Sequence, residues 1–132
     1  MLKRKLEDGT VVGLSIESVQ GGVLITLDNQ PADSTPKFLQ SFLLNPAEVA
    51  ELIYGMGRDY CEIRAKDGRE LIFHNPRAFE RCIASIEVRE SKFDYVVFPL
   101  RECEIRFIVK ALENMADSLL FVGTWSGEPE EM

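Results

Sequence analysis

The sequence predicts an α+β fold in which antiparallel sheets are backed by two or three helices. Turn signals containing glycine recur between segments whose apolar and polar residues alternate, as in hairpins of half-buried strands. Two later segments, beginning near residues 46 and 101, instead repeat apolar residues at the spacing of an amphipathic helix. With 132 residues, 45% of them hydrophobic, the chain can bury one core, so we expect a single domain over residues 1–124.

The N-terminal part of the chain predicts four strands. Asp8-Gly9 is a two-residue turn signal between strands at 2–7 and 10–19. Gly21-Gly22 marks a second tight turn, which would pair Ile16 with Leu27. The resulting alternation places six apolar residues on one face: Val12, Leu14, Ile16, Val23, Ile25 and Leu27. A polar loop follows, and then a strand at about 37–44 has a face made of Phe38, Phe42 and Leu44.

The first helix has the clearest local signals. Asn45 is a favourable N-cap, Pro46 suits the first helical position, and Glu48 is placed to return the hydrogen bond of the cap. Gly55 and Gly57 mark the end of the helix. Its predicted buried stripe consists of Val49, Leu52, Ile53 and Met56.

The second half predicts two more hairpins and a final helix. A two-residue turn at Asp67-Gly68 pairs Cys61 with His74. One face then contains Cys61, Ile63, Ile72 and His74, and the other contains Tyr60, Arg64, Lys66, Arg69, Leu71 and Phe73. The segment from 76 to about 84 fits either a helix or a strand, and we favour a short helix. Strands at 85–89 and 93–98 follow, and a helix from about 101 to 117 buries Ile105, Ile108, Val109, Leu112 and Met115.

An internal sequence similarity relates the two halves of the chain, about 1–57 and 58–118. A shift of 56 residues superposes Phe42, Leu44, Glu48, Val49, Leu52, Ile53 and Met56 on Phe98, Leu100, Glu104, Ile105, Ile108, Val109 and Leu112. Both halves then end in a strand that runs into an amphipathic helix, which suggests a pseudo-duplicated sheet-plus-helix unit. The alternative is that any two strand-to-helix junctions share this pattern.

Charge and cysteine content limit the class of protein. The net charge is −7, but residues 58–110 contain eleven Lys or Arg and ten Asp or Glu, whereas residues 125–132 form an acidic segment with the composition of a disordered tail. No apolar stretch approaches the roughly 20 residues of a membrane span, so we expect a cytoplasmic protein without membrane contact. Cys61, Cys82 and Cys103 form neither a C-x-x-C pair nor a disulfide pattern, and we expect no metal and no cofactor.

The sequence contains one candidate for nucleophilic catalysis. Cys61 could be activated by His74 if the two side chains meet across the predicted hairpin. The same face carries Ile63 and Ile72, so burial of both groups in or beside the core is the stronger interpretation. We therefore expect that the protein is not an enzyme.

A cluster of cations and aromatic rings on the later strands suggests a binding surface. Its members are Tyr60, Arg64, Lys66, Arg69, Phe73, Arg89, Lys92, Phe93 and Tyr95. Single-stranded DNA or RNA needs cations along its phosphates and flat rings for its bases, so this composition predicts single-stranded nucleic-acid binding. Alternatively, the rings belong to the core or to a homodimer seam, and the chain is an acidic protein-interaction module, a dimeric chaperone or adaptor that uses Leu39, Leu43 or the aromatic face.

Two segments carry a family resemblance. IEVRESKF at 86–93 and FLLNPAEV at 42–49, together with strand-rich halves that each end in a helix, resemble the Pur-alpha, Whirly and transcription-coactivator superfamily of single-stranded-nucleic-acid-binding folds. Those proteins place basic and aromatic residues on the exposed face of a sheet and a helix behind it. The resemblance implies binding through Arg89, Lys92, Phe93 and Tyr95.

Overall fold

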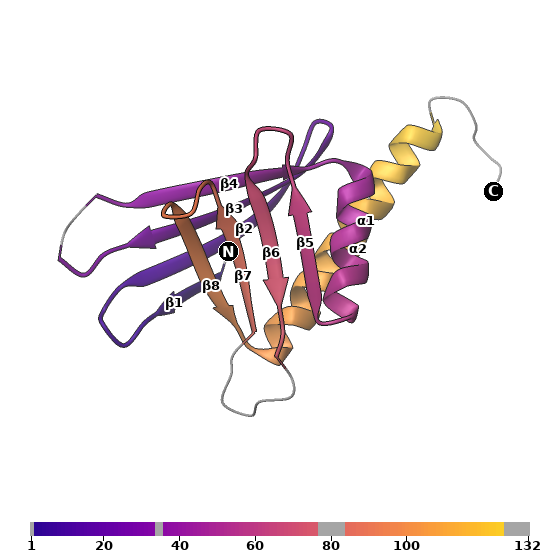
Figure 1. Cartoon of the computed structure of the whole chain (residues 1–132). Coiled ribbons are helices and arrows are strands. Elements are labelled where there is room, and N and C mark those ends of the chain that lie inside the picture. The colour runs from indigo at the N-terminus through magenta and orange to yellow at the C-terminus, as the bar shows by residue number, and fades with distance from the viewer. Residues whose placement is uncertain (1, 34–35, 77–83, 126–132) are drawn as a thin grey trace.

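The computed structural model describes residues 2–33, 36–76 and 84–125. It consists of two units, each made of four antiparallel strands and a helix (Figure 1). The first unit comprises β1 (Leu2–Lys5), β2 (Val11–Val19), β3 (Gly22–Gln30), β4 (Phe38–Leu44) and α1 (Pro46–Gly57). The second comprises β5 (Tyr60–Arg64), β6 (Glu70–His74), β7 (Ala84–Arg89), β8 (Tyr95–Leu100) and α2 (Glu102–Trp125). The predicted α+β class is confirmed.

The two sheets pack against each other through their apolar faces. In sheet A (β1–β4) and sheet B (β5–β8), the strands are neighbours in chain order. Strand β8 contacts β2 and β3, while β4 contacts β7 and β8, and Figure 1 shows the strands of the two sheets crossing steeply. Helices α1 and α2 pack side by side at one end of the sheets. Within the described ranges, no helix is both long enough and apolar enough to cross a membrane.

The predicted signals at the start of α1 are confirmed. The Glu48 N–H donates to Asn45 Oδ1 at 2.8 Å, and the Asn45 N–H donates to Glu48 Oε1 at 2.9 Å, so both halves of a capping box are present. Val49 and Leu52 are fully buried, and Met56 is nearly so. Gly55 packs against β5, because a Cβ at this position would clash with Cys61 and lie 2.9 Å from the Tyr60 carbonyl oxygen.

The sequence similarity at a shift of 56 residues corresponds to equivalent core positions in the two units. Wherever one of these apolar residues is buried in β4 or α1, the equivalent residue 56 positions later in β8 or α2 is buried too. These pairs are Phe42 and Phe98, Leu44 and Leu100, Val49 and Ile105, Leu52 and Ile108, and Met56 and Leu112. The repeated pattern therefore reflects a repeated sheet-plus-helix unit, and both copies contribute to one buried cluster.

Both Asp-Gly turns are one residue longer than the sequence predicts. Leu6 N–H donates to the Thr10 carbonyl at 2.7 Å, and Ala65 N–H donates to the Arg69 carbonyl at 2.8 Å, so each loop has three residues. Gly9 and Gly68 adopt φ values of 89° and 94°, as the last residue of such a loop requires. Cys61 consequently lies opposite Phe73 rather than His74.

The turn between β2 and β3 also differs from the expected register, but the faces do not change. Val19 pairs with Gly22, and Ile16 pairs with Ile25 rather than with Leu27. This shift of two residues preserves the alternation of faces. The six predicted apolar residues therefore share the inner face of sheet A, and all except the half-buried Ile16 are buried.

The C-terminal helix is longer than predicted. It runs to Trp125, a residue that the sequence assigned to the tail. Of its expected stripe, Ile105, Ile108 and Leu112 are buried, and Val109 and Met115 are partly buried against the core. The rest of the predicted tail lies outside the described residues, as does nearly all of the predicted helix at 76–84; Ala84 itself begins strand β7.

Candidate functional site

The outer face of sheet B is organised in rows that cross all four strands. One row contains Arg64, Glu70, Arg89 and Tyr95. The next contains Glu62, Ile72, Glu87 and Val97, and a third contains Tyr60, His74, Ser85 and Pro99. Along each strand, these side chains alternate with side chains that point to the buried inner face. Tyr60 and Tyr95, on the two edge strands, are 52% and 45% exposed. The face is therefore open to solvent at both edge strands.

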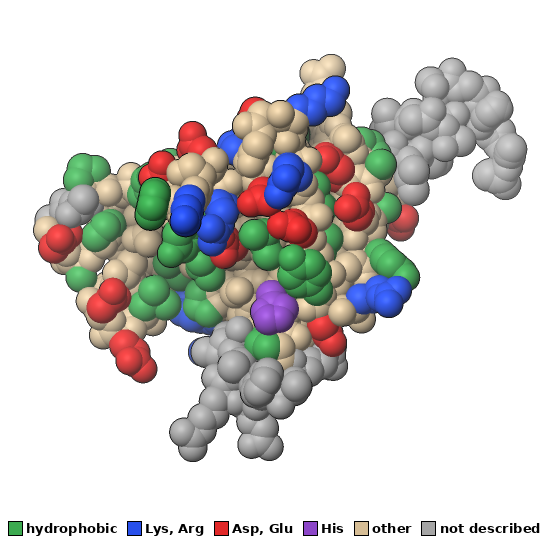
Figure 2. All heavy atoms as spheres, viewed as in Figure 1, with side chains coloured by type: hydrophobic (Ala, Val, Ile, Leu, Met, Phe, Trp, Pro, Cys, Tyr) green, Lys and Arg blue, Asp and Glu red, His purple; other side chains and the backbone are tan. Residues whose placement is uncertain are grey.

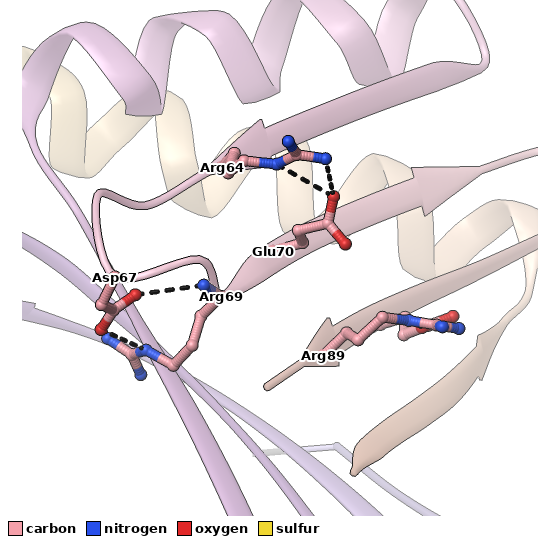
Figure 3. Close-up of polar contacts among 6 residues, drawn as sticks. Arg64, Asp67, Arg69, Glu70 and Arg89 are labelled. Atoms are coloured by element: carbon pink, nitrogen blue, oxygen red, sulfur yellow. Dashed lines mark hydrogen bonds and ion pairs between the residues drawn. The ribbon is translucent and has the colours of Figure 1, made fainter. Parts of the chain in front are cut away.

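The two arginines of this face are paired with glutamates. Arg64 donates to Glu70 Oε2 from Nε and Nη2 at 3.3 and 2.8 Å, and Arg89 Nε donates to Glu87 Oε2 at 2.6 Å. Figure 3 shows that Arg64, Glu70 and Arg89 project from neighbouring strands to the same side of the sheet. The hydrogen bond from Arg64 lowers the pKa of Glu70, because it stabilises the ionised carboxylate.

Acidic and basic side chains consequently alternate on this face rather than forming a continuous basic patch. Figure 2 shows red and blue side chains interleaved over sheet B. Among the described strand residues that point outward, Arg64 and Arg89 are accompanied by the acids Glu62, Glu70 and Glu87. The electrostatic field of the face is therefore close to balanced.

Aromatic rings lie at both edges of the face. The Arg89 guanidinium lies 4.6 Å from the centroid of the Tyr95 ring, which favours a cation–π contact. At the opposite edge, the Tyr60 ring meets His74 in an edge-to-face arrangement with centroids 6.0 Å apart. Burial, reinforced by the nearby Glu62 and Glu70, raises the pKa of the Tyr60 hydroxyl.

The structure corrects the predicted position of Phe73. Its side chain is fully buried on the inner face of sheet B, opposite Cys61. The three-residue turn at Gly68 shifts the pairing by one residue, and such a shift moves the side chains of one strand to the other face. Phe73 is therefore part of the core and does not belong to the binding surface.

Arg69 also makes contacts within the fold and is not presented on the predicted binding surface. Its Nη1 donates to the Ser41 carbonyl of β4 at 2.6 Å, and its guanidinium lies 5.8 Å from the Phe42 ring centroid. Its Nε donates to Asp67 at 3.0 Å (Figure 3). Arg69 therefore fastens the β5–β6 turn to the last strand of sheet A.

The remaining predicted residues lie in turns beside the first row. Lys66 is exposed in the β5–β6 turn. Lys92 and Phe93 are in the β7–β8 turn, where the Lys92 ammonium lies 5.9 Å from a ring that is 85% exposed. Since the strands on both sides are antiparallel, these two turns lie at the same end of sheet B. This end collects Arg64, Lys66, Arg89, Lys92, Phe93 and Tyr95, whereas Tyr60 lies two rows away.

The register also separates the candidate catalytic pair. Cys61 is on the inner face, and His74 is exposed on the outer face. Burial raises the pKa of the Cys61 thiol to about 11, which disfavours the nucleophilic thiolate. In the described part of the chain, no group of three or more His, Cys, Asp or Glu residues is arranged to hold a metal ion.

The acids of the outer face were missed by the sequence reasoning. Glu70 and Glu87 are separated by 17 positions, and the pairing of β6 with β7 places them in neighbouring rows of one face. A scan of this chain against protein-family models and a search of curated proteins found no match. The assignment of this surface therefore depends on its geometry.

Proposed function

We propose that the protein binds single-stranded DNA or RNA at the turn-bearing end of the outer face of sheet B. The observation that carries this proposal is the clustering of Arg64, Arg89 and Tyr95 in one row of an open sheet face, with the exposed Phe93 in the adjoining turn. Exposed rings provide stacking platforms worth roughly 1–3 kcal/mol per base, and the guanidinium groups can hold phosphates. The two strand-rich units that each end in a helix support the same function, because the family resemblance implies halves of this kind.

The acidic residues on the face determine the affinity that we expect and the interactions on which it depends. Exposed ion pairs contribute little to stability, so a phosphate can replace Glu70 as the partner of Arg64 at small cost. The net charge of −7 opposes long-range attraction to a polyanion. We therefore expect modest affinity that depends mainly on stacking.

Fluorescence anisotropy with labelled single-stranded DNA and RNA, each at two salt concentrations, tests the proposal. Tyr95→Ala should weaken binding by about 1–3 kcal/mol with little change in salt dependence. Tyr54→Ala is the matched control, since Tyr54 is a 63% exposed tyrosine on α1 that also contacts an arginine, Arg58, at 5.4 Å. No affinity at low salt, or equal losses in the two variants, would contradict the proposal.

A specific feature of sheet A favours the second candidate function, protein binding. Leu39 and Leu43 of β4 are 57% and 51% exposed on the outer face, and Leu43 pairs with Leu24 of β3. Leu43 and the half-buried Leu24 are neighbours across the two strands, and contiguous apolar residues at the surface are typical of a partner-binding site. A photo-crosslinking residue at position 43 tests this candidate in cells. A discrete crosslinked protein would support it, and its persistence in a Leu39→Ser variant would count against a role of the leucine face.

Two further expectations belong to the same proposal. Binding of nucleic acid in this way requires no cofactor and no catalytic group. We place the function in the cytoplasm, the compartment that the sequence predicts. Cell fractionation with an antibody against the chain would test the location.

A further inference from the structure

The two ion pairs on the outer face of sheet B differ in exposure. The Arg64 side chain, on the edge strand β5, is 70% exposed, whereas the side chains of Arg89 and Glu87 on β7 are 31% and 15% exposed. The Arg89 guanidinium also lies 4.6 Å from the centroid of the Tyr95 ring. Figure 3 shows this guanidinium apart from the Arg64–Glu70 pair. A phosphate can therefore displace the carboxylate at the exposed Arg64, while Arg89 and Glu87 stay together when a strand binds.

The Arg89–Glu87 pair keeps hydrogen-bonding groups free for a ligand. Arg89 donates to Glu87 Oε2 from Nε at 2.6 Å, and this is its one hydrogen bond among the described residues. Its two terminal Nη groups therefore retain their donors. Glu87 Oε1 accepts no hydrogen bond from any residue that the structure describes. The pair thus presents a fork of donors beside an acceptor.

Guanine and cytosine are the bases whose edges match this arrangement. Guanine presents the neighbouring acceptors N7 and O6 and then the N1–H donor, and cytosine presents the acceptors O2 and N3 and then its N4 amino group. Adenine, thymine and uracil instead alternate acceptor, donor and acceptor along the same edges. The arginine fork requires two neighbouring acceptors and the carboxylate requires a donor, so guanine and cytosine alone satisfy both groups.

Aromatic and apolar side chains surround the pair on the same face. Tyr95 lies in the first row beside the guanidinium, and the 85% exposed Phe93 lies in the adjoining turn. These rings provide stacking surfaces for bases. The neighbours of Glu87 in its own row, Ile72 and Val97, are apolar and half-buried. Their side chains offer the edge of a base no competing hydrogen bond, so the charged pair is the polar group that a base meets there.

We propose that sheet B prefers single strands that contain guanine or cytosine, and that the Arg89–Glu87 pair recognises the edge of these bases. The exposed Arg64 instead contacts phosphate, which is the same in every sequence. This inference rests on the proposed function, because a strand must bind before one of its bases can be recognised.

Fluorescence anisotropy with four labelled single strands of equal length tests the preference. One probe contains thymine alone, and in the other three cytosine, guanine or adenine replaces thymine at regular intervals. The unaltered protein should bind the cytosine and guanine strands at least about fivefold more tightly than the thymine and adenine strands, as a bidentate contact to a base provides.

Arg89→Lys separates recognition of a base from attraction to phosphate. Lysine keeps the positive charge but cannot donate in a planar fork to two neighbouring acceptors. The preference for cytosine and guanine should therefore disappear, while the affinity for the thymine strand and its salt dependence should stay nearly unchanged. A preference that survives this substitution would contradict recognition by the guanidinium.

Glu87→Met and Glu62→Met form a matched pair of variants. Both glutamates lie in the second row of the outer face, and each substitution removes one negative charge. Glu62 forms no ion pair with the residues that the structure describes. Glu87→Met should abolish the preference, because the acceptor for the base donor is lost. Glu62→Met should raise the affinity for all four strands alike and retain the preference. Circular dichroism would verify that the variants are folded.

The outcomes distinguish this inference from the function on which it rests. No affinity for any of the four strands at low salt would contradict the proposed function and this inference with it. Equal affinities for the four strands would overturn the inference alone and leave single-stranded nucleic-acid binding standing. A preference that persists in Glu87→Met, or one that is lost equally in Glu62→Met, would also overturn it.

Discussion

Arg4 in β1 binds both carboxylate oxygens of Glu104 in α2, with Nη2–O distances of 2.6 and 2.5 Å. The Arg4 Nη1 also donates to the Pro99 carbonyl at 2.6 Å, so one side chain joins the first strand, the last strand and the last helix. Both charged groups are only about 15% exposed. Arg4→Met should reduce the free energy of unfolding in urea by about 1.5–3 kcal/mol, the range for hydrogen bonds to charged groups. The control Arg64→Met, which removes an exposed arginine from its ion pair, should have a much smaller effect.

The same ion pair predicts a dependence of stability on pH. Burial alone would raise the pKa of Glu104, but hydrogen bonds from Arg4 and from the Arg101 N–H outweigh it and lower the pKa below the ordinary value of 4.5. The unfolded chain then binds a proton more readily than the folded chain. The stabilisation is complete above pH 4.5 and is lost as the pH falls through the lowered pKa. Urea unfolding at several acidic pH values should show a weaker decline in Glu104→Gln than in the unaltered chain; equal declines would exclude Glu104 as a cause.

Two glycines of α1 form a matched pair for testing the contact between the helix and sheet B. A Cβ at Gly55 would clash with Cys61, whereas a Cβ at Gly57 would meet nothing within 4 Å. Gly55→Ala should therefore destabilise the protein by about 1–3 kcal/mol. Gly57→Ala should be neutral or stabilising by up to about 1 kcal/mol, because alanine restricts the unfolded chain. Chemical denaturation of both variants measures the difference, and equal effects would mean that α1 is not pressed against β5.

The sequence predicted the parts of the fold that are determined locally. The cap of α1 depends on Asn45 and Glu48, which are three residues apart, and the buried stripe follows from a helical period. Turn length was less predictable, because an Asp-Gly pair occurs in both two-residue and three-residue hairpin loops. Gly68 occupies the last position of a three-residue loop. The one extra loop residue shifts the strand register by one, and this shift places Phe73 in the core.

The candidate site was only partly predictable for a related reason. Arg64, Arg89 and Tyr95 were assigned to an exposed face, and they share one row. Their pairing with acids could not be predicted, because it depends on which residues face each other across strands that are distant in the sequence. Glu70 lies between Arg64 and Arg89 only because β6 pairs with both β5 and β7. Strand register therefore determines the charge of the face as well as its composition.

The burial of Cys61 predicts slow modification of its thiol. Its pKa is raised to about 11, chiefly by burial, so both access and thiolate content are low near neutral pH. In a variant with Cys82→Ser and Cys103→Ser, a thiol reagent should react slowly with the folded protein and rapidly after denaturation. A variant that retains only the exposed Cys103 should react rapidly in both states. Rapid native labelling of Cys61 would contradict its position on the inner face.

The ion pairs on sheet B predict that removing an acid strengthens nucleic-acid binding. Glu70 accepts two hydrogen bonds from Arg64, so Glu70→Gln would release this guanidinium for a phosphate. Affinity for all single-stranded sequences should rise, and the slope of log K against log salt should steepen by roughly 0.7 for one added phosphate contact. Anisotropy titrations at several salt concentrations measure both quantities.

The control for this prediction is Glu17→Gln, which changes the net charge equally on the exposed surface of sheet A. It should raise affinity only slightly, because its charge acts over a longer and screened distance. If the two variants bind alike, the gain comes from net charge and Arg64 does not contact the phosphates. If instead Glu70→Gln alone steepens the salt dependence, the released guanidinium is part of the binding surface. The pair thus separates local pairing from the overall charge of the molecule.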